Sequence, residues 1–201
     1  IIILTLIHSF SNNLTLLNSF RAISFQVVSI ITTTGYSTAD YTTWGYFLTF
    51  IFFLFLFSGA SAGSTSGGIK IVRIIILIKN SLLEFKRRLH PKAVIPVILN
   101  GSAISNHIIY NLLAFIFLYL FIFILGSIIL SGLGLDFLSA ISAVASAVGN
   151  VGPGIASVGP SYSFDHVPDL GKWVLSLLML MGRLELFTVC LIFTPYFWKR
   201  I

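Results

Sequence analysis

The sequence is poor in charge. Of its 201 residues, only 9% are Asp, Glu, Lys or Arg, whereas 57% are hydrophobic. An ordinary soluble domain carries about 25% charged residues, and a chain with so few cannot cover a core with a polar surface. Disordered, collagen-like and nucleic-acid-binding proteins are therefore excluded, and the composition predicts an integral membrane protein with several helices.

Cysteine is almost absent as well. Cys190 is the only one and lies in an apolar run, which excludes a disulfide framework and a cysteine-based metal site. The four histidines, His8, His90, His107 and His166, are scattered along the chain, and none belongs to an HExxH pattern. A metal-dependent hydrolase is therefore not expected.

Three apolar segments are candidates for membrane-spanning helices. Residues 108–130 contain no charge and would reach about 34 Å as a helix, enough to cross the hydrocarbon of a bilayer. We predict one helix over 105–131 and another over 170–198. Residues 44–90 predict an interrupted helix, because ten small residues, 59–68, divide the apolar run.

The positions of the charges predict the orientation of these helices. Basic side chains concentrate in one block and at the end of the chain: Lys70, Arg73, Lys79, Lys86, Arg87, Arg88, Lys92, Lys199 and Arg200. The acidic residues Asp40, Asp136, Asp165 and Asp169 lie in the other connections. Since positively charged loops stay in the cytoplasm, 44–78 should run inward, 105–131 outward and 170–198 inward. The basic run at 82–91 could also bind anionic membrane lipid, although a cytoplasmic flank explains it more simply.

Two further segments, 20–34 and 135–150, are too short and too rich in Ser, Thr and Ala to be spans. Each starts and ends on the outer side, so each should enter the membrane as a short helix and turn back. The pattern is an internal repeat, with one copy over 1–104, including a cytoplasmic linker at its end, and the other over 105–201. The first copy keeps only the short run 1–7 of its leading helix, so we expect the chain to begin partway along that helix.

The turns that close these re-entrant segments, within 20–38 and 135–154, are candidates for a selectivity filter. Backbone that is not helical is tolerated inside a membrane only where it packs in protein or lines water. A row of carbonyls there can replace the hydration shell of a cation, and glycine permits the left-handed angles that aim successive carbonyls at one axis. The candidate filter residues are Thr33, Thr34, Gly35, Tyr36, Asn150, Val151, Gly152 and Pro153. One such turn could be an outer hairpin with a capped helix end, but two in register favour a filter.

The small residues 59–68 admit three interpretations. The glycine spacing of four is typical of close helix packing, and the segment superficially resembles a phosphate-binding loop without meeting its GxxxxGK[ST] pattern. Packing alone would not need four hydroxyl groups, so we favour an unwound loop that can move and block a pore. Its candidate residues are Gly59, Ser61, Gly63, Ser64, Thr65, Ser66, Gly67 and Gly68.

Arg183 falls near the middle of the predicted helix over 170–198. An arginine at the centre of a bilayer costs at least about 2.5 kcal/mol unless its donors are satisfied. Glu185 is two positions away and points elsewhere, so we expect Arg183 to hold the 59–68 loop through its carbonyls and hydroxyls. The alternative is that Arg183 faces another helix or a part of the protein outside this sequence.

Four motifs, in order along nearly the whole chain, resemble the Trk/Ktr/HKT family of potassium transporters, TrkH-type pore subunits in particular. They are the stretches 32–40, 59–70, 149–154 and 182–187. The resemblance implies an all-α membrane protein in which four helix–re-entrant loop–helix repeats surround a pore. This chain would supply the third and fourth repeats, the C-terminal half.

The resemblance also implies function. Potassium would cross the bacterial cytoplasmic (inner) membrane through a multi-pass protein, with the filter residues named above as its ligands. The 59–68 loop would act as the gate beneath them and Arg183 would hold that gate. The family works with a cytosolic nucleotide-binding regulatory subunit of the TrkA/KtrA type and usually as a homodimer. Potassium is the transported ion, and no covalently bound cofactor and no enzymatic activity are expected.

Two other functions stay open at the level of sequence. One is an intramembrane hydrolase that would use a serine of the 59–68 loop with His107, although residues 63–67 do not form a GxSxG nucleophile motif because their central residue is Thr65. The other is a non-conducting assembly subunit that keeps the fold without the ion path. The preference for potassium over sodium also depends on repeats outside this sequence.

Overall fold

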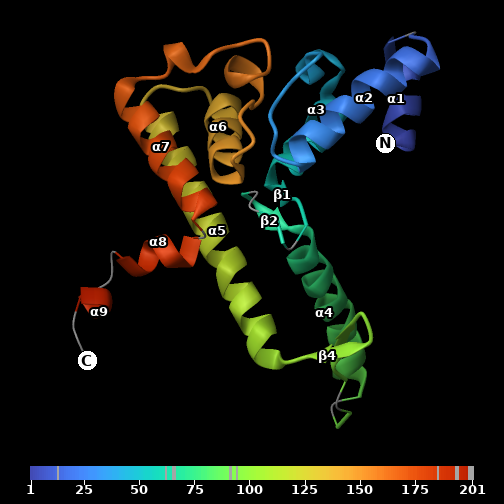
Figure 1. Ribbon diagram of the computed structural model, residues 1–201, viewed down its shortest axis with the longest axis vertical. Coiled ribbons are helices and arrows are strands. Elements are labelled where there is room, and N and C mark those ends of the chain that lie inside the picture. The colour runs from blue at the N-terminus through green and yellow to red at the C-terminus, as the bar shows by residue number, and fades with distance from the viewer. Residues whose placement is uncertain are drawn as a thin grey trace.

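The computed structural model describes residues 1–12, 14–61, 63–64, 67–90, 92–93, 95–184, 186–192 and 195–198, and most of them are helical (Figure 1). The helices are α1 (Ile2–Asn12), α2 (Leu16–Ile31), α3 (Tyr46–Phe57), α4 (Ile71–Leu89), α5 (Asn106–Gly132), α6 (Phe137–Gly149), α7 (Asp169–Arg183), α8 (Leu186–Ile192) and α9 (Pro195–Trp198). Short 3-10 turns cover Tyr41–Thr43, Ala156–Val158 and Phe164–His166. The strands are β1 (Ser58–Gly59), β2 (Ile69–Lys70), β3 (Val97–Leu99) and β4 (Ser102–Ile104).

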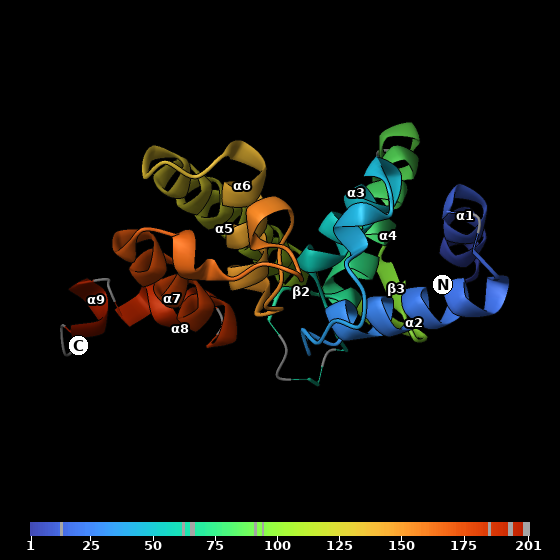
Figure 2. The same ribbon diagram turned by 90° about the horizontal axis from the view of Figure 1, so that it is seen from above.

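The molecule divides into two halves that lie side by side when seen from above (Figure 2). The first holds α1 to α4, and the second holds α5 to α9. Each half contains a short helix, α2 or α6, followed by a polar turn, an irregular segment and a helix that returns along the molecule. This order is the one that the repeat pattern of the sequence predicts.

Helix α6 lies at the centre of the fold and contacts α5, α7 and α3. Every residue from Ser142 to Gly149 is buried. Nearly all of these side chains are small, so neighbouring helices approach closely, and helix α5 does so at Gly126, where an added methyl group would lie 3.0 Å from Leu178 Cδ1 and 3.1 Å from Val144 Cγ1. The short, serine-rich and alanine-rich sequence therefore forms a fully packed helix.

The predicted interrupted helix is confirmed. Helix α3 ends at Phe57 and α4 begins at Ile71. Between them β1 pairs in parallel with β2, Ser58 opposite Ile69 and Gly59 opposite Lys70. This two-residue clasp brings the two ends of the 59–68 loop together.

The predicted single helix over 170–198 is wrong. Helix α7 ends at Arg183, and α8 follows at an angle of 115° to it. Gly182 lies at this bend, where α7 packs so closely on α6 that an added methyl group would lie 2.1 Å from Val148 O. Glycine has no side chain and a low helix propensity, so it permits this close approach near the point where the helix ends. Among the described helices, only α5 is long and apolar enough to cross a bilayer alone, and α7 with α8 passes the same test as a bent pair.

Two further details differ from the expectation. Helix α1 extends to Asn12, beyond the run 1–7, because its polar residues pack inward: His8 is buried, and its ring centroid lies 4.5 Å from that of Trp44. The predicted cytoplasmic linker contains a hairpin, since β3 and β4 pair antiparallel. Its turn, Asn100–Gly101, has φ values of 49° and 82°, the left-handed pair that tight hairpins need.

Candidate functional site

The two polar turns predicted as filter segments lie against each other. We name residues 33–36 the first polar turn and residues 150–153 the second. A methyl group added to Gly35 would lie 2.1 Å from Val151 O and 3.4 Å from Pro153 Cδ, and one added to Gly152 would lie 3.9 Å from Gly35 Cα. The contact is thus backbone against backbone, and it joins residues more than a hundred positions apart in the sequence.

Both polar turns have the same alternating backbone. Thr33 and Gly35 have φ values of 54° and 78°, and Asn150 and Gly152 have values of 53° and 115°. The residue between each pair does not have a positive φ. Alternation between left-handed and ordinary conformations turns successive carbonyls toward one side, the arrangement that cation coordination by backbone requires.

A serine four residues before each turn fixes its far end. Ser29 Oγ donates to Tyr36 O at 2.6 Å, and Ser146 Oγ donates to Gly152 O at 2.8 Å. Gly152 N in turn donates to Ser146 Oγ at 3.1 Å. The carbonyls of Tyr36 and Gly152 therefore face their own short helices, which leaves those of residues 33–35 and 150–151 as the stronger candidate ligands.

Two more serines of α6 hold the segment that follows the second polar turn. Ser142 Oγ donates to Ile155 O at 3.0 Å and accepts from Ile155 N at 3.1 Å. Ser139 Oγ contacts Ser157 Oγ at 2.6 Å and accepts from Ser157 N at 3.1 Å. With Ser146, these serines form a row at spacings of three and four on one face of α6. The abundance of serine was evident from the sequence, but the role of these serines was not predicted; their helical spacing is the signal that could have revealed it.

Tyr41 connects the two halves next to the polar turns. Its side chain is fully buried, and its hydroxyl donates to Gly154 O at 2.6 Å. Gln26, buried in α2, donates to Ala39 O and so holds the segment that leads from the first turn to Tyr41. Neither residue was predicted from the sequence, because each acts through the backbone of a distant segment.

Two aspartates stabilise the outer connections as capping residues. Asp136 Oδ2 accepts from Ser139 N at 3.1 Å at the start of α6, and the Ser139 hydrogen bonds hold the pKa of this carboxyl below its usual value. Partial burial of Asp40 acts to raise its pKa, but hydrogen bonds from Thr42 outweigh that effect and the pKa is lowered. Asp40 Oδ1 accepts from Thr42 N at 2.9 Å. Both carboxylates therefore stay ionised at neutral pH, where they cap the elements on either side of the polar turns.

The glycine-rich loop meets the end of α6 directly below the second polar turn. A methyl group added to Gly67 would lie 2.5 Å from Gly149 O, and one added to Gly59 would lie 2.4 Å from Gly67 O. Gly67 is buried, whereas Ser61 and Gly63 are exposed. The structure thus places the base of the predicted gating loop against the candidate filter. Thr65 and Ser66 lie outside the described residues.

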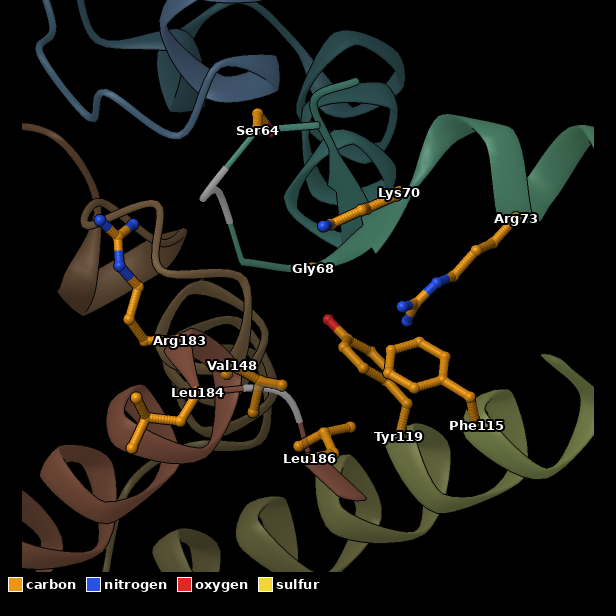
Figure 3. Close-up of a pocket in the computed structure, with 11 residues that line it drawn as sticks. Ser64, Gly68, Lys70, Arg73, Phe115, Tyr119, Val148, Arg183, Leu184 and Leu186 are labelled. Atoms are coloured by element: carbon orange, nitrogen blue, oxygen red, sulfur yellow. The ribbon is translucent and has the colours of Figure 1, made fainter. Parts of the chain in front are cut away.

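A cavity of about 340 Å³ opens beneath this loop (Figure 3). Ser64 and Gly68 line it from the loop, Lys70 and Arg73 from the start of α4, and Tyr119 from α5. Arg73 Cζ lies 4.1 Å from the ring centroid of Phe115. Tyr119 is 1% exposed, and within the described chain its hydroxyl has no hydrogen-bond partner.

Arg183 lies on the rim of the same cavity, at the last residue of α7 and on the other side from Lys70 (Figure 3). Its side chain is exposed, and among the described residues it makes no ion pair or hydrogen bond. The predicted holding contact thus stays a prediction, although Arg183 and Ser64 line one cavity. The structure brings together both polar turns, the loop base and Arg183, which the sequence also predicts to lie close together.

The chain matches known cation transporters along most of its length. The profile of the TrkH family, described as "Cation transport protein", matches residues 3–200. The Trk system potassium uptake protein TrkH of Halomonas elongata is 39% identical over 184 residues, which is 92% of this chain and 38% of that protein. TrkH of Escherichia coli K12 is 38% identical over 176 residues, 88% of this chain and 36% of that protein.

A solved structure agrees with these sequence matches. The crystal structure of the potassium transporter TrkH from Vibrio parahaemolyticus matches with a TM-score of 0.88 at 38% identity, and the match covers 98% of this chain and 42% of that one. The likeness confirms the predicted all-α membrane fold. This chain spans about two fifths of the length of these relatives. By sequence and by fold, it belongs to the TrkH family of cation transport proteins.

Proposed function

We propose that this chain forms the third and fourth of four pore repeats in a transporter that takes up potassium across the bacterial cytoplasmic membrane. The repeats would be residues 1–104 and 105–201. The observation that carries the proposal is the contact of two polar turns with the same alternating backbone, Gly35 against Val151. Its relatives are named as potassium uptake proteins, which supports potassium as the transported ion.

In this proposal the protein acts by exchanging water for carbonyl oxygen around the ion. The carbonyls of Thr33, Thr34, Gly35, Asn150 and Val151 supply half of the ligand set, and the other two repeats supply the rest. Because the serines of α2 and α6 fix the turns, the carbonyls are held apart at a set distance before the ion arrives. A fixed carbonyl cage lowers the cost of dehydration for an ion of matching size.

The loop at 59–68 would close the path on the cytoplasmic side of the filter. Its base lies against Gly149, and its exposed residues Ser61 and Gly63 have room to move. We propose Arg183 as the side chain that holds the loop, because Arg183 and Ser64 face the same cavity.

The same proposal includes a set of partners. The basic residues of α4, with Lys199 and Arg200, would face the cytoplasm, where a nucleotide-binding regulatory subunit would dock. The protein would work as a homodimer in the inner membrane, with several spans per subunit, and without a covalently bound cofactor.

Potassium uptake by the protein with all four repeats, in cells that lack other uptake systems, tests the filter assignment. Gly35→Ala and Gly152→Ala each place a side chain at a positive φ, a strain of roughly 1–3 kcal/mol, so we expect uptake to fall about tenfold or more. Gly132→Ala is the matched control, because its added methyl group meets no atom within 4 Å. Equal uptake by all three variants, at equal protein levels, would contradict the assignment.

The two alternative functions predict different experimental results. A hydrolase would bring a loop serine to His107, but His107 lies at the exposed start of α5, where its Nδ1 contacts Asn111 Nδ2 at 3.3 Å. Labelling of the wild-type protein by a serine-directed probe would support that rival. A non-conducting assembly subunit would insert normally but restore no potassium uptake.

A further inference from the structure

Three elements of the candidate site meet at one side chain, that of Asn150. Its Nδ2 atom donates to Met179 O, in the last turns of α7, at 3.1 Å. A methyl group added to Gly182 of the same helix would lie 2.6 Å from that Nδ2 atom. On the other side, a methyl group added to Gly67 of the loop would lie 2.9 Å from it. The end of α7 and the base of the loop therefore both lie next to the side-chain amide of Asn150.

The backbone of the same residue starts the second polar turn. Asn150 adopts the left-handed conformation, with φ 53° and ψ 39°, and its N–H donates to Ala147 O at 3.1 Å as it caps α6. Asparagine is one of the few residues other than glycine that accept this conformation readily. The side-chain amide and the first carbonyl of the turn thus belong to one residue, so a change in the backbone angles of Asn150 displaces both.

Among the described residues, the first polar turn has no such connection. Thr33 holds the equivalent left-handed position, with φ 54°, but a threonine hydroxyl is shorter than an amide. The Thr34 hydroxyl of this turn is used locally, since its Oγ1 contacts Oγ1 of the preceding Thr32 at 2.7 Å. Within the part of the chain that the structure describes, the link to both the loop and the returning helix is therefore found in the second half.

We propose that Asn150 is a positioning residue whose side-chain amide couples the loop and the bend after α7 to the second polar turn. When Gly67 moves away, or when the end of α7 shifts at Gly182, the bond to Met179 O changes and the carbonyl of Asn150 turns with it. Loop position and filter shape then change together. The inference rests on the proposed function, because it gives the gate a direct effect on selectivity.

The test measures loop position and selectivity separately in the protein with all four repeats. Ser64→Cys, in a Cys190→Ala background, reports loop position through its rate of reaction with a water-soluble thiol reagent. Asn150→Asp keeps the size and the left-handed preference but removes the donor, and Asn150→Gly removes the whole side chain without backbone strain. Losing one hydrogen bond of ordinary strength corresponds to a factor of about five. We expect both variants to change the labelling rate by about that factor and to shift the ratio of potassium to sodium flux.

Thr33→Gly is the matched control, since it removes a side chain at the equivalent position of the turn that lacks the link. Its labelling rate should stay within about twofold of the parent, because among the described residues no hydrogen bond joins the Thr33 side chain to the loop. If the Asn150 variants alter selectivity but leave the labelling rate unchanged, the coupling is overturned and Asn150 acts in the turn alone. If they alter neither, the positioning role is overturned as well. Absence of potassium uptake by the parent protein would instead overturn the proposed function, and labelling would still report on the coupling.

Discussion

At the scale of single residues, the site depends on serine hydroxyl groups that form hydrogen bonds with irregular backbone. Ser142 both donates to and accepts from Ile155, and it is fully buried. Its hydroxyl thereby replaces the bonds that an irregular segment cannot make to itself. Ser29 and Ser146 bond to backbone in the same way. Hydroxyl groups on the two short helices thus replace the backbone–backbone hydrogen bonds that a helix or strand would make.

Ser142→Ala should destabilise the protein. The change leaves Ile155 N without its partner in a dry interior, which costs about 1–3 kcal/mol. Thermal unfolding of the purified protein in detergent measures the loss. Ser176→Ala is the control, because Ser176 is exposed and donates only to Lys172 O of its own helix. Equal melting temperatures for the two variants would show that Ile155 finds another partner.

The repeat pattern predicted the polar turns, because two glycine-containing turns in register, each after a short apolar helix, favour a filter over plain hairpins. Residues that act across long sequence distances could not be found this way. Tyr41 and Gln26 look like ordinary members of an outer loop and an apolar helix, and their partners, Gly154 and Ala39, are backbone atoms. No pattern in the side chains marks a carbonyl as the acceptor.

At the scale of elements, close helix packing depends on where small residues fall. Helix α5 passes α6 and α7 at Gly126, which faces Val144 and Leu178. The apolar character of 105–131 predicts the helix, but it does not predict its packed face, since nearly every residue is apolar. The glycine is the feature that identifies that face.

Gly126→Val should push α5 away from α6. Overpacking at such a contact costs typically 1–3 kcal/mol, so we expect a lower melting temperature and a smaller fraction of folded protein after extraction. Gly132→Val is the matched control on the same helix, where no atom lies within 4 Å of an added methyl group. If the two variants behave alike, the contact at Gly126 is not tight in the membrane.

The bend between α7 and α8 shows why the last helix was mispredicted. Hydrophobicity and length are satisfied by a straight helix over 170–198, and Gly182 alone does not end a helix. The bend arises because the end of α6 occupies the space next to α7, with Val148 O closest to Gly182. This contact is part of the tertiary structure, so the bend cannot be predicted from the hydrophobicity and length of the segment.

At the scale of the whole molecule, the two halves form one core around the polar turns. Ala145, Val151 and Ile155 of the second half pack in the same cluster as Ile23, Phe52 and other residues of the first. The second polar turn therefore packs partly on residues of the first half, and the candidate site draws on both halves.

Tyr41→Phe tests this joint core. It removes the hydrogen bond between the halves and leaves Gly154 O without that donor, a loss of about 1 kcal/mol. We expect the melting temperature to fall by a few degrees. Tyr46→Phe is the control, since Tyr46 is 98% exposed. A drop of the same size in both variants would mean that the phenol hydroxyl at 41 contributes nothing specific.

The clasp formed by β1 and β2 also affects the timescales on which the loop and the helices can move. Because Ser58 and Gly59 pair with Ile69 and Lys70, the ends of α3 and α4 are joined to each other independently of the loop. Short segments with fixed ends move in nanoseconds to microseconds, whereas helices rearrange in microseconds to milliseconds. If the loop gates as proposed, its own movements would give brief interruptions of current. Long closures would then require the helices that carry the clasp to move.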